Sequence, residues 1–156
     1  MLLSIRRAAL SDASDITQCV ISAYSSYIER MGQKPGPMLD DYSDVINQHQ
    51  VFVAEGKAAV SDTNTVILGI LVLQQSDQGW LLDNVAVDPQ FHGRGIGKRL
   101  INHAETLVKS SSASHIDLYT HERMTENIAM YMAMGYDELE RKRVGSFDRV
   151  YMRKLL

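Results

Sequence analysis

Cysteine is almost absent from the sequence, with Cys19 the only one among 156 residues. A chain that cannot form an internal disulfide is typical of a reducing compartment, so we expect a cytoplasmic protein. Three prolines and ten glycines are too few for a linker-rich or collagen-like chain. No apolar run approaches the roughly 18 residues of a membrane span. Charge follows only a very short apolar stretch at the start, unlike a secretory signal, so we expect no membrane partner.

Basic residues are also in short supply. Sixteen Lys and Arg stand against nineteen Asp and Glu, which gives a formal net charge of −3. Proteins that bind nucleic acid electrostatically usually carry a strong basic excess, so we expect no nucleic-acid partner. The length fits one domain of roughly 100–200 residues, and we predict a single domain over residues 1–156.

The pattern of apolar residues and turn signals predicts both helices and strands. The predicted helices cover residues 13–29, 38–48, 93–109 and 125–134. The predicted strands cover residues 2–6, 51–55, 65–73, 78–87, 115–120, 137–144 and 147–154. One strand–turn–helix–strand succession suits a parallel crossover, whereas the other strands follow one another like hairpins. The sequence therefore predicts an α/β (α+β) protein with a mixed sheet.

The most informative segment is a glycine-rich turn between a strand and a helix. Gly93, Gly95 and Gly97 alternate there, and glycine lets the backbone come close to a ligand. The first amides of a helix point outward without internal partners, so such a turn can hold an anion such as pyrophosphate. Arg94, Lys98 and Arg99 oppose the helix dipole unless an anion binds there. A plain tight turn is the alternative, but it does not require so many glycines and cations.

Two nucleotide motifs do not fit this turn. A Walker motif needs Ser or Thr after its lysine, but Arg99 follows Lys98. A dinucleotide fingerprint needs G-x-G-x-x-G, whereas the spacing here is G-x-G-x-G.

Residues 87–100 read Val-x-Pro-x-x-x-Gly-x-Gly-x-Gly-x-x-Leu, and residues 131–136 read Tyr-x-x-x-Gly-Tyr. In this order and spacing the two motifs resemble the GNAT superfamily of N-acetyltransferases. The resemblance implies a strongly twisted mixed sheet of about six to seven strands with helices on both faces. It also implies transfer of an acetyl group from acetyl-CoA, as cosubstrate, to an amine.

The same resemblance implies a site for acetyl-CoA. In the family a β-bulge in the strand before the turn frees an amide that polarises the thioester carbonyl, and the turn holds the diphosphate. His92 departs from the Arg or Gln that is usual in the family. Asn127 is expected either to face the cosubstrate or to cap a helix. The expected binding residues are Val85, Ala86, Val87, His92, Gly93, Arg94, Gly95, Ile96, Gly97, Lys98 and Asn127.

Tyr131 matches the family's proton donor to the departing thiolate, with packing at a helix end as the alternative. For the general base we consider Asp83, which by strand period two shares a face with Val85 and Val87. A solvated carboxylate is the alternative for Asp83. Glu122 is the second candidate base, and ordered water is the third.

The acceptor is less defined. The first helices and their loop shape the acceptor site in the family, so the expected lining residues are Tyr24, Tyr27, Met38 and Asp41, with Glu122 from a later strand. A small amine, an amino acid and a protein amine all remain open, as does a homodimer. A non-catalytic acyl-CoA-binding sensor is the alternative function. We expect no metal, because His121-Glu122 lacks the second His of an H-E-x-x-H motif.

Overall fold

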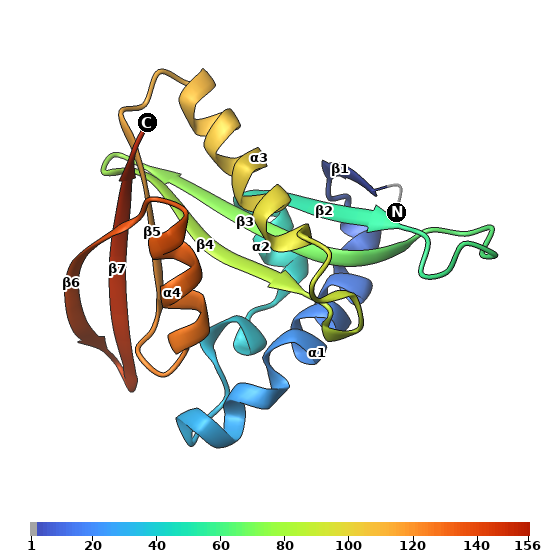
Figure 1. Ribbon diagram of the computed structural model, residues 1–156, viewed down its shortest axis with the longest axis horizontal. Coiled ribbons are helices and arrows are strands. Elements are labelled where there is room, and N and C mark those ends of the chain that lie inside the picture. Colours follow the sequence, from blue (N-terminus) through green and yellow to red (C-terminus); the bar gives the residue numbers. More distant parts are fainter. Residues whose placement is uncertain (1–2) are drawn as a thin grey trace.

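The computed structural model describes residues 3–156, which contain a seven-stranded sheet in the order β1-β2-β3-β4-β5-β7-β6 (Figure 1). The strands are β1 (Leu3–Arg7), β2 (Gln50–Gly56), β3 (Val66–Ser76), β4 (Gly79–Val87), β5 (His115–His121), β6 (Asp137–Val144) and β7 (Phe147–Leu155). Neighbouring strands are antiparallel except β4 and β5, which are parallel. The predicted mixed sheet is therefore confirmed. Leu2, at the start of the first predicted strand, lies outside the described residues.

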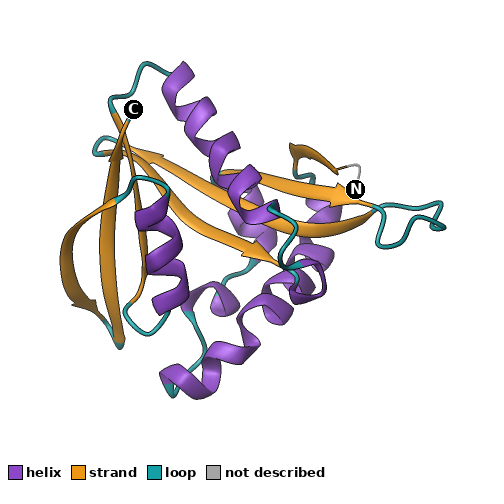
Figure 2. Cartoon of the chain, viewed as in Figure 1, coloured by secondary structure: helices purple, strands orange, loops and turns teal. Residues whose placement is uncertain are grey.

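Four α-helices flank this sheet (Figure 2). They are α1 (Ala13–Met31), α2 (Tyr42–Gln48), α3 (Ile96–Ser110) and α4 (Thr125–Ala133). Three short 3₁₀ helices join them, namely η1 (Leu10–Asp12), η2 (Gly36–Leu39) and η3 (Pro89–Phe91). The predicted helix over residues 38–48 is thus divided, because Asp41 caps α2 by accepting the amide hydrogens of Ser43 and Asp44.

The sheet separates two hydrophobic cores. The α3 and α4 face holds Leu71, Leu82 and Leu118 among its buried side chains. The α1 and α2 face holds Ile70 and Val72 from the same β3 strand. Successive residues of a strand point to opposite faces, so the continuous apolar run of β3 supplies both cores. Helices therefore cover both faces, as the family resemblance implied.

β4 and β5 separate part-way along their length. Their parallel pairing is limited to Leu81 with Asp117 and Leu82 with Leu118. Beyond these pairs the two strands no longer share a ladder, although both continue to residues 87 and 121. The backbone groups at the separated ends are consequently available to a ligand instead of to a neighbouring strand.

A β-bulge lies at the same point of β4. Val72 of β3 pairs with Asn84 whereas Leu73 pairs with Leu82, so Asp83 is the extra residue of the bulge. The bulge reverses the alternation of side chains, since Leu82, Val85 and Val87 all pack on the face that α3 covers. Asp83 instead bonds Tyr119 on the other face. The expectation that Asp83 shares a face with Val85 was wrong, because period two does not hold across a bulge.

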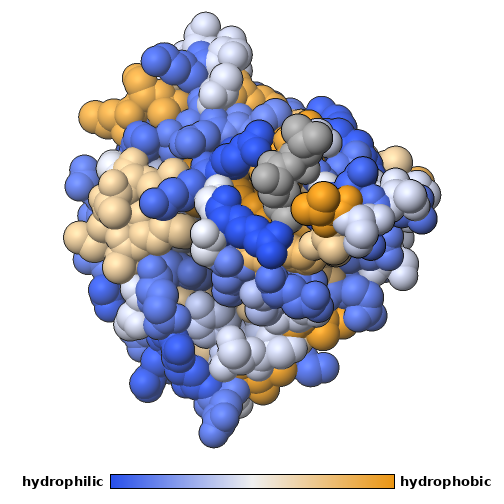
Figure 3. Space-filling view, turned by 45° about the vertical axis from the view of Figure 1, so that its right-hand side comes forward, coloured by the Kyte–Doolittle hydropathy of each residue, from blue (hydrophilic) through white to orange (hydrophobic). Residues whose placement is uncertain are grey.

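Exposed hydrophobic residues are dispersed over the surface. Figure 3 shows one face of the molecule on which hydrophilic residues surround separate apolar patches. The large apolar side chains that are exposed come from different elements, including Leu39 of η2 and Leu139 of β6. Among residues 3–156 no helix is both long and apolar enough to cross a membrane.

Candidate active site

The glycine-rich turn opens into a cavity that we call the turn cleft. It lies between α1, the end of β4, the start of α3 and α4. Its lining residues are Ala23, Tyr24, Tyr27, Val85, Ala86, Val87, Phe91, His92, Gly93, Gly95, Ile96, Gly97, Lys98, Glu126, Asn127, Met130 and Tyr131. The structure therefore brings together all the residues predicted to bind acetyl-CoA except Arg94.

The backbone of the turn is unobstructed on its outer side. Gly93 and Gly95 have φ of 79° and 74°, and a Cβ on either would meet no atom within 4 Å. These values lie in the left-handed region, where glycine costs least. Gly95 is also the N-cap of α3, and the first turn of that helix carries no acidic residue. The first amides of α3, which have no partner within the helix, and the charge of Lys98 are thus suited to a phosphate group.

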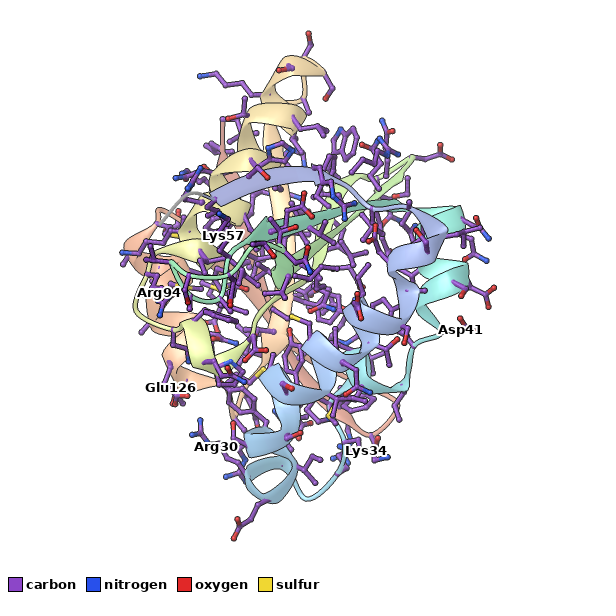
Figure 4. The ribbon with its side chains drawn as sticks, turned by 90° about the vertical axis from the view of Figure 1, so that its right-hand side faces the viewer. Arg30, Lys34, Asp41, Lys57, Arg94 and Glu126 are labelled. Atoms are coloured by element: carbon purple, nitrogen blue, oxygen red, sulfur yellow. The ribbon has the colours of Figure 1, made fainter. Side chains whose placement is uncertain are left out.

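His92 and Arg94 take different places in this turn. The Nε2 atom of His92 lies 3.2 Å from the carbonyl oxygen of Val87, so the imidazole ties the turn to the end of β4. The Arg94 guanidinium lies over the ring of Phe91, 5.3 Å from its centroid. Arg94 lines a separate hollow with Lys57, and Figure 4 shows the two on the same side of the molecule. Arg94 is accordingly not placed in the turn cleft.

A second cavity lies where β4 and β5 separate, and we call it the wedge cavity. It is bounded by the sheet, α1 and the segment after it, α4 and the start of β7. Its lining residues are Tyr24, Met31, Pro35, Gly36, Pro37, Leu82, Asp83, Asn84, Val85, Tyr119, Thr120, His121, Met124, Asn127, Tyr131, Phe147 and Arg149. Four of them, Tyr24, Val85, Asn127 and Tyr131, also line the turn cleft. The two cavities therefore meet at these residues.

Tyr131 is the chemically significant residue at this junction. Its side chain is 4% exposed, and its ring lies edge-on to Tyr136 with 5.9 Å between centroids. Within residues 3–156 its hydroxyl makes no hydrogen bond. Burial raises the pKa of the Tyr131 phenol above its usual value of 10. The phenol is therefore protonated at neutral pH and has a hydrogen to donate.

Asp83 lines the wedge cavity from the bulge of β4. Its Oδ1 atom accepts a hydrogen bond of 2.7 Å from the hydroxyl of Tyr119. Burial, and then the charge of Asp83, raise the pKa of the Tyr119 phenol, so Tyr119 stays the donor. The carboxylate keeps lone pairs that Tyr119 does not use, and these can accept a proton from a ligand or from a bridging water.

A chain of buried polar groups fixes the bulge. The hydroxyl of Tyr24 donates to Asn84 Oδ1 over 2.6 Å and lies 3.1 Å from the carbonyl oxygen of Val85. Asn84 Nδ2 donates to the hydroxyl of Tyr42 over 3.0 Å, and Tyr42 donates to the carbonyl oxygen of Pro37 over 2.7 Å. A satisfied buried network of this kind is rigid. It ties the bulge to α1, α2 and η2.

The predicted acceptor residues separate into two groups. Tyr24 lines both cavities, whereas Tyr27 lines the turn cleft and its hydroxyl lies 3.3 Å from Glu126 Oε2. Met38 packs against the core between α1 and the sheet and lines neither cavity. Asp41 caps α2, and Figure 4 shows it on the opposite side of the view from Arg94. The structure thus places only Tyr24 of these four in the wedge cavity.

Two further expectations change with the structure. Glu122, the second candidate base, lines a hollow with Arg123 and Arg141 outside the wedge cavity. The N-cap of α4 is Met124, and no side chain caps it. Asn127 therefore does not act as a cap, and its Nδ2 lies 3.6 Å from the Met124 sulfur. Its place at the junction of the cavities agrees with the ligand-facing alternative.

Sequence reasoning did not select several residues of the wedge cavity. His121 accepts the amide hydrogen of Arg123 at Nδ1 over 3.1 Å, and burial lowers the pKa of its imidazole below 6.5. The guanidinium of Arg149 lies 4.0 Å from the centroid of the Tyr119 ring. The polar Asn84 within an apolar strand could have indicated a site in the sequence. No sequence pattern indicates Arg149, because its place in the cavity depends on the pairing of β7 with β5.

Among residues 3–156 no group of three or more His, Cys, Asp or Glu side chains is placed to hold a metal ion. Glu126 is the acidic residue that lines the turn cleft, and it pairs with Arg30 at 2.7 Å. Figure 4 shows these two side chains beside each other. The pairing reduces the repulsion that Glu126 would exert on an anion in the cleft.

The sequence of residues 21–136 matches the family described as "Acetyltransferase (GNAT) family". The chain belongs to this family. GNAT acetyltransferases also share its fold. A PaiA N-acetyltransferase from Thermoplasma acidophilum in complex with coenzyme A is 17% identical with a TM-score of 0.79, with 100% of each chain covered.

A GNAT-family acetyltransferase from Staphylococcus aureus is 18% identical with a TM-score of 0.77, with 99% of each chain covered. A ribosomal-protein alanine N-acetyltransferase from Escherichia coli is 16% identical with a TM-score of 0.75, with 99% of this chain and 94% of that one covered. At these identities the likeness shows the GNAT fold alone. No curated protein matches the chain in sequence.

Proposed function

We propose that this GNAT protein is an acetyl-CoA-dependent N-acetyltransferase whose single domain covers residues 1–156. It moves an acetyl group to a primary amine by direct attack of the amine on the thioester. The observation that carries the proposal is the meeting of the turn cleft and the wedge cavity at Tyr131. One cavity suits a phosphate-bearing cosubstrate, the other suits an acceptor, and a protonated phenol lies between them.

The turn cleft fits acetyl-CoA. The diphosphate would bind backbone amides of the glycine turn and the ammonium of Lys98, because a Cβ on Gly93 or Gly95 would meet only open space. The pantetheine arm would pair with the backbone of Val85–Val87, since β4 has no ladder with β5 beyond Leu82. The coenzyme A bound to the relative from Thermoplasma acidophilum is consistent with this cosubstrate.

The acceptor amine must lose a proton before it attacks. An alkylamine with a pKa of about 10.4 is mostly charged at neutral pH, and its deprotonation at pH 7 costs about 4–5 kcal/mol. Asp83 is the carboxylate that lines the wedge cavity, and it accepts this proton directly or through a water. Tyr119 holds the carboxylate in place from the other side.

The departing thiolate needs a hydrogen-bond donor. A free thiol has a pKa near 8.5, below that of the Tyr131 phenol, so complete proton transfer from the phenol would be unfavourable in water. Burial raises the pKa of the thiol as well as that of the phenol. Tyr131 donates a hydrogen bond that stabilises the thiolate as it forms and passes a proton to it, and the proton lost by the acylated nitrogen restores the phenol.

The test is release of coenzyme A thiol from acetyl-CoA in the presence of a panel of amines. The panel contains alkylamines, amino acids and peptides with free N-termini, and each product is identified by mass spectrometry. We expect thiol release with at least one amine, in a one-to-one ratio with its N-acetyl product. Acetyl-CoA binding by calorimetry without an acetylated product from any amine would contradict the proposal and indicate a sensor.

A further inference from the structure

The lining of the wedge cavity includes one acidic and one basic side chain that do not form an ion pair with each other. They are Asp83 and Arg149, and the remaining lining residues are apolar or uncharged apart from His121, whose pKa is lowered by burial. Within residues 3–156 no carboxylate forms an ion pair with Arg149; its contacts are the ring of Tyr119 and the hydroxyl of Tyr151. The guanidinium therefore keeps N–H groups for an anion that enters the cavity.

Tyr119 contacts the carboxylate of Asp83 and the guanidinium of Arg149 through different parts of its side chain. Its hydroxyl donates to Asp83 over 2.7 Å, while the guanidinium of Arg149 lies 4.0 Å from the centre of its ring. Arg149 Nη1 donates to the hydroxyl of Tyr151 over 3.2 Å. A guanidinium has five N–H groups in a fixed fork that matches a carboxylate. The cavity thus presents a preorganised anion site beside the carboxylate that is proposed to take the amine proton.

The rest of the cavity indicates a small acceptor. Apolar side chains cover much of it, namely Met31, Pro35, Pro37, Leu82, Met124 and Phe147. On one side Gln33 and Ser146 join the segment after α1 to the turn before β7 through two hydrogen bonds of 2.8 Å. These bonds connect two segments of the cavity wall. A polypeptide could pass between the two segments only if both hydrogen bonds broke.

We propose that the acceptor is a free α-amino acid with an uncharged side chain. This inference rests on the proposed function and names its substrate class. The substrate carboxylate pairs with Arg149, its ammonium lies toward Asp83, and its side chain packs on the apolar wall. One ammonium proton leaves through Asp83 to water. The nitrogen then bonds to the acetyl carbon, the carbon–sulfur bond breaks, and a second nitrogen proton ends on the thiol.

The first test compares matched acceptors with the wild-type enzyme at saturating acetyl-CoA. The acceptors are L-leucine, L-leucinamide, 3-methylbutylamine and a peptide with an N-terminal leucine. A carboxylate paired to a guanidinium is worth about 10- to 100-fold in affinity. We expect kcat/KM for L-leucine to exceed that for the other three acceptors by about that factor. Equal or better turnover of the amide, the amine or the peptide would overturn the inference.

The second test changes the guanidinium. Arg149→Met is expected to raise the KM for L-leucine about 10- to 100-fold and to lower kcat/KM for L-leucine relative to that for 3-methylbutylamine by the same factor. Arg149→Lys should recover part of the loss, because it restores the charge without the fork. Arg143→Met, at an exposed position of β6 outside the cavity, is the control and should match the wild type. Calorimetry should give the same acetyl-CoA affinity for all four proteins.

Two outcomes separate this inference from the proposed function. If several amines are acetylated without preference for a carboxylate, the amino-acid acceptor is wrong while the acetyltransferase proposal stands. If acetyl-CoA binds and no amine is acetylated, the proposed function itself fails. An equal loss of leucine and 3-methylbutylamine turnover in Arg149→Met would also overturn the inference, since Arg149 would then serve the fold or the chemistry instead of carboxylate recognition.

Discussion

At the scale of single residues, the hydroxyl of Tyr131 differs from those of the other buried tyrosines at the site. Tyr131 combines a buried ring with a hydroxyl that has no hydrogen-bond partner among residues 3–156, whereas the hydroxyls of Tyr24 and Tyr119 are bonded. Tyr131 lines both cavities, so a ligand at their junction can accept a hydrogen bond from this hydroxyl. This contrast distinguishes Tyr131 from the tyrosines that stabilise the fold.

Tyr131→Phe removes only this hydroxyl. We expect kcat to fall by about 10²- to 10⁴-fold, the usual contribution of general acid catalysis. The affinity for acetyl-CoA should change little, because the hydroxyl acts mainly as the thiolate forms. Steady-state kinetics and calorimetry measure the two quantities. The defect should also shrink with an acyl donor whose leaving thiol is more acidic.

Tyr136→Phe is the matched control. The Tyr136 ring packs against Tyr131, but its hydroxyl donates to Glu105 over 2.9 Å outside both cavities. Its kcat should stay within a few-fold of the wild type. Wild-type turnover by Tyr131→Phe, with chemistry shown to be rate-limiting, would assign Tyr131 to packing alone.

At the scale of elements, the turn before α3 and the bulge of β4 together build the site. The sequence predicted the turn because glycines and cations at a strand-to-helix junction together indicate an anion-binding site. The position of the bulge at Asp83 follows from the register of β3 against β4, which no local pattern specifies. For the same reason the wedge cavity was only partly predictable, since Arg149 and Tyr119 meet through long-range pairing.

Gly95→Asp tests the turn. We expect calorimetry to detect no acetyl-CoA binding, because the side chain enters the space proposed for the diphosphate and its carboxylate repels it. Gly32→Asp is the matched control, since Gly32 has φ of 73°, also has no atom within 4 Å of a Cβ, and ends α1 away from the turn cleft. The positive φ should cost each variant on the order of 1–2 kcal/mol of stability, and the carboxylate at the C-terminal end of α1 should cost Gly32→Asp more through the helix dipole. Binding by Gly95→Asp with wild-type affinity would place the cosubstrate elsewhere.

Substitution of Gly69 in β3 tests the packing of the sheet against α3, the helix that follows the turn. A Cβ there would lie 2.9 Å from the carbonyl oxygen of Ala86 and 3.1 Å from Leu100 of α3. Gly69→Ala should therefore lower the free energy of unfolding by about 1–3 kcal/mol, as overpacking of a core does. Gly36→Ala, where a Cβ meets no atom within 4 Å, should leave it nearly unchanged. Urea denaturation checks both, and equal midpoints for the two variants would contradict this packing.

At the scale of the whole molecule, the sheet with its two helical faces was predictable from the sequence. Apolar runs and turn residues determine strands and helices locally, and the two GNAT motifs supplied the fold. The limits of α2 were less accurate, because Asp41 acts as a cap instead of as an acceptor ligand. Burial, which the sequence does not report directly, decides how the molecule responds to pH.

Acid should destabilise the protein in two stages. Burial lowers the pKa of His103 and His121 below 6.5, so the unfolded chain binds more protons and stability falls as the pH falls below about 6.5. The ion pair with Arg6 lowers the pKa of Asp12 below 3.8, so that contribution is lost only at lower pH. Thermal unfolding should give a constant midpoint between pH 7 and 8 and a falling one below.

His103→Gln provides the control for the first stage. His103 packs edge-on to Phe52, 4.6 Å between ring centroids, and lies outside both cavities. The variant should have a shallower fall of its thermal midpoint between pH 6.5 and 5 than the wild type. An identical slope in the two proteins would mean that His103 titrates alike in the folded and unfolded chains.

Acetyl transfer at the junction of the two cavities is tested by following the acetyl group itself. Acetyl-CoA labelled in the acetyl carbonyl carbon is mixed with the protein and the amine that turns over best. We predict that one equivalent of label reaches the amine nitrogen for each thiol released, and that Tyr131→Phe slows both processes by the same factor. Thiol release without labelled N-acetyl product, or label transfer that does not depend on Tyr131, would contradict acetyl transfer at the junction of the two cavities.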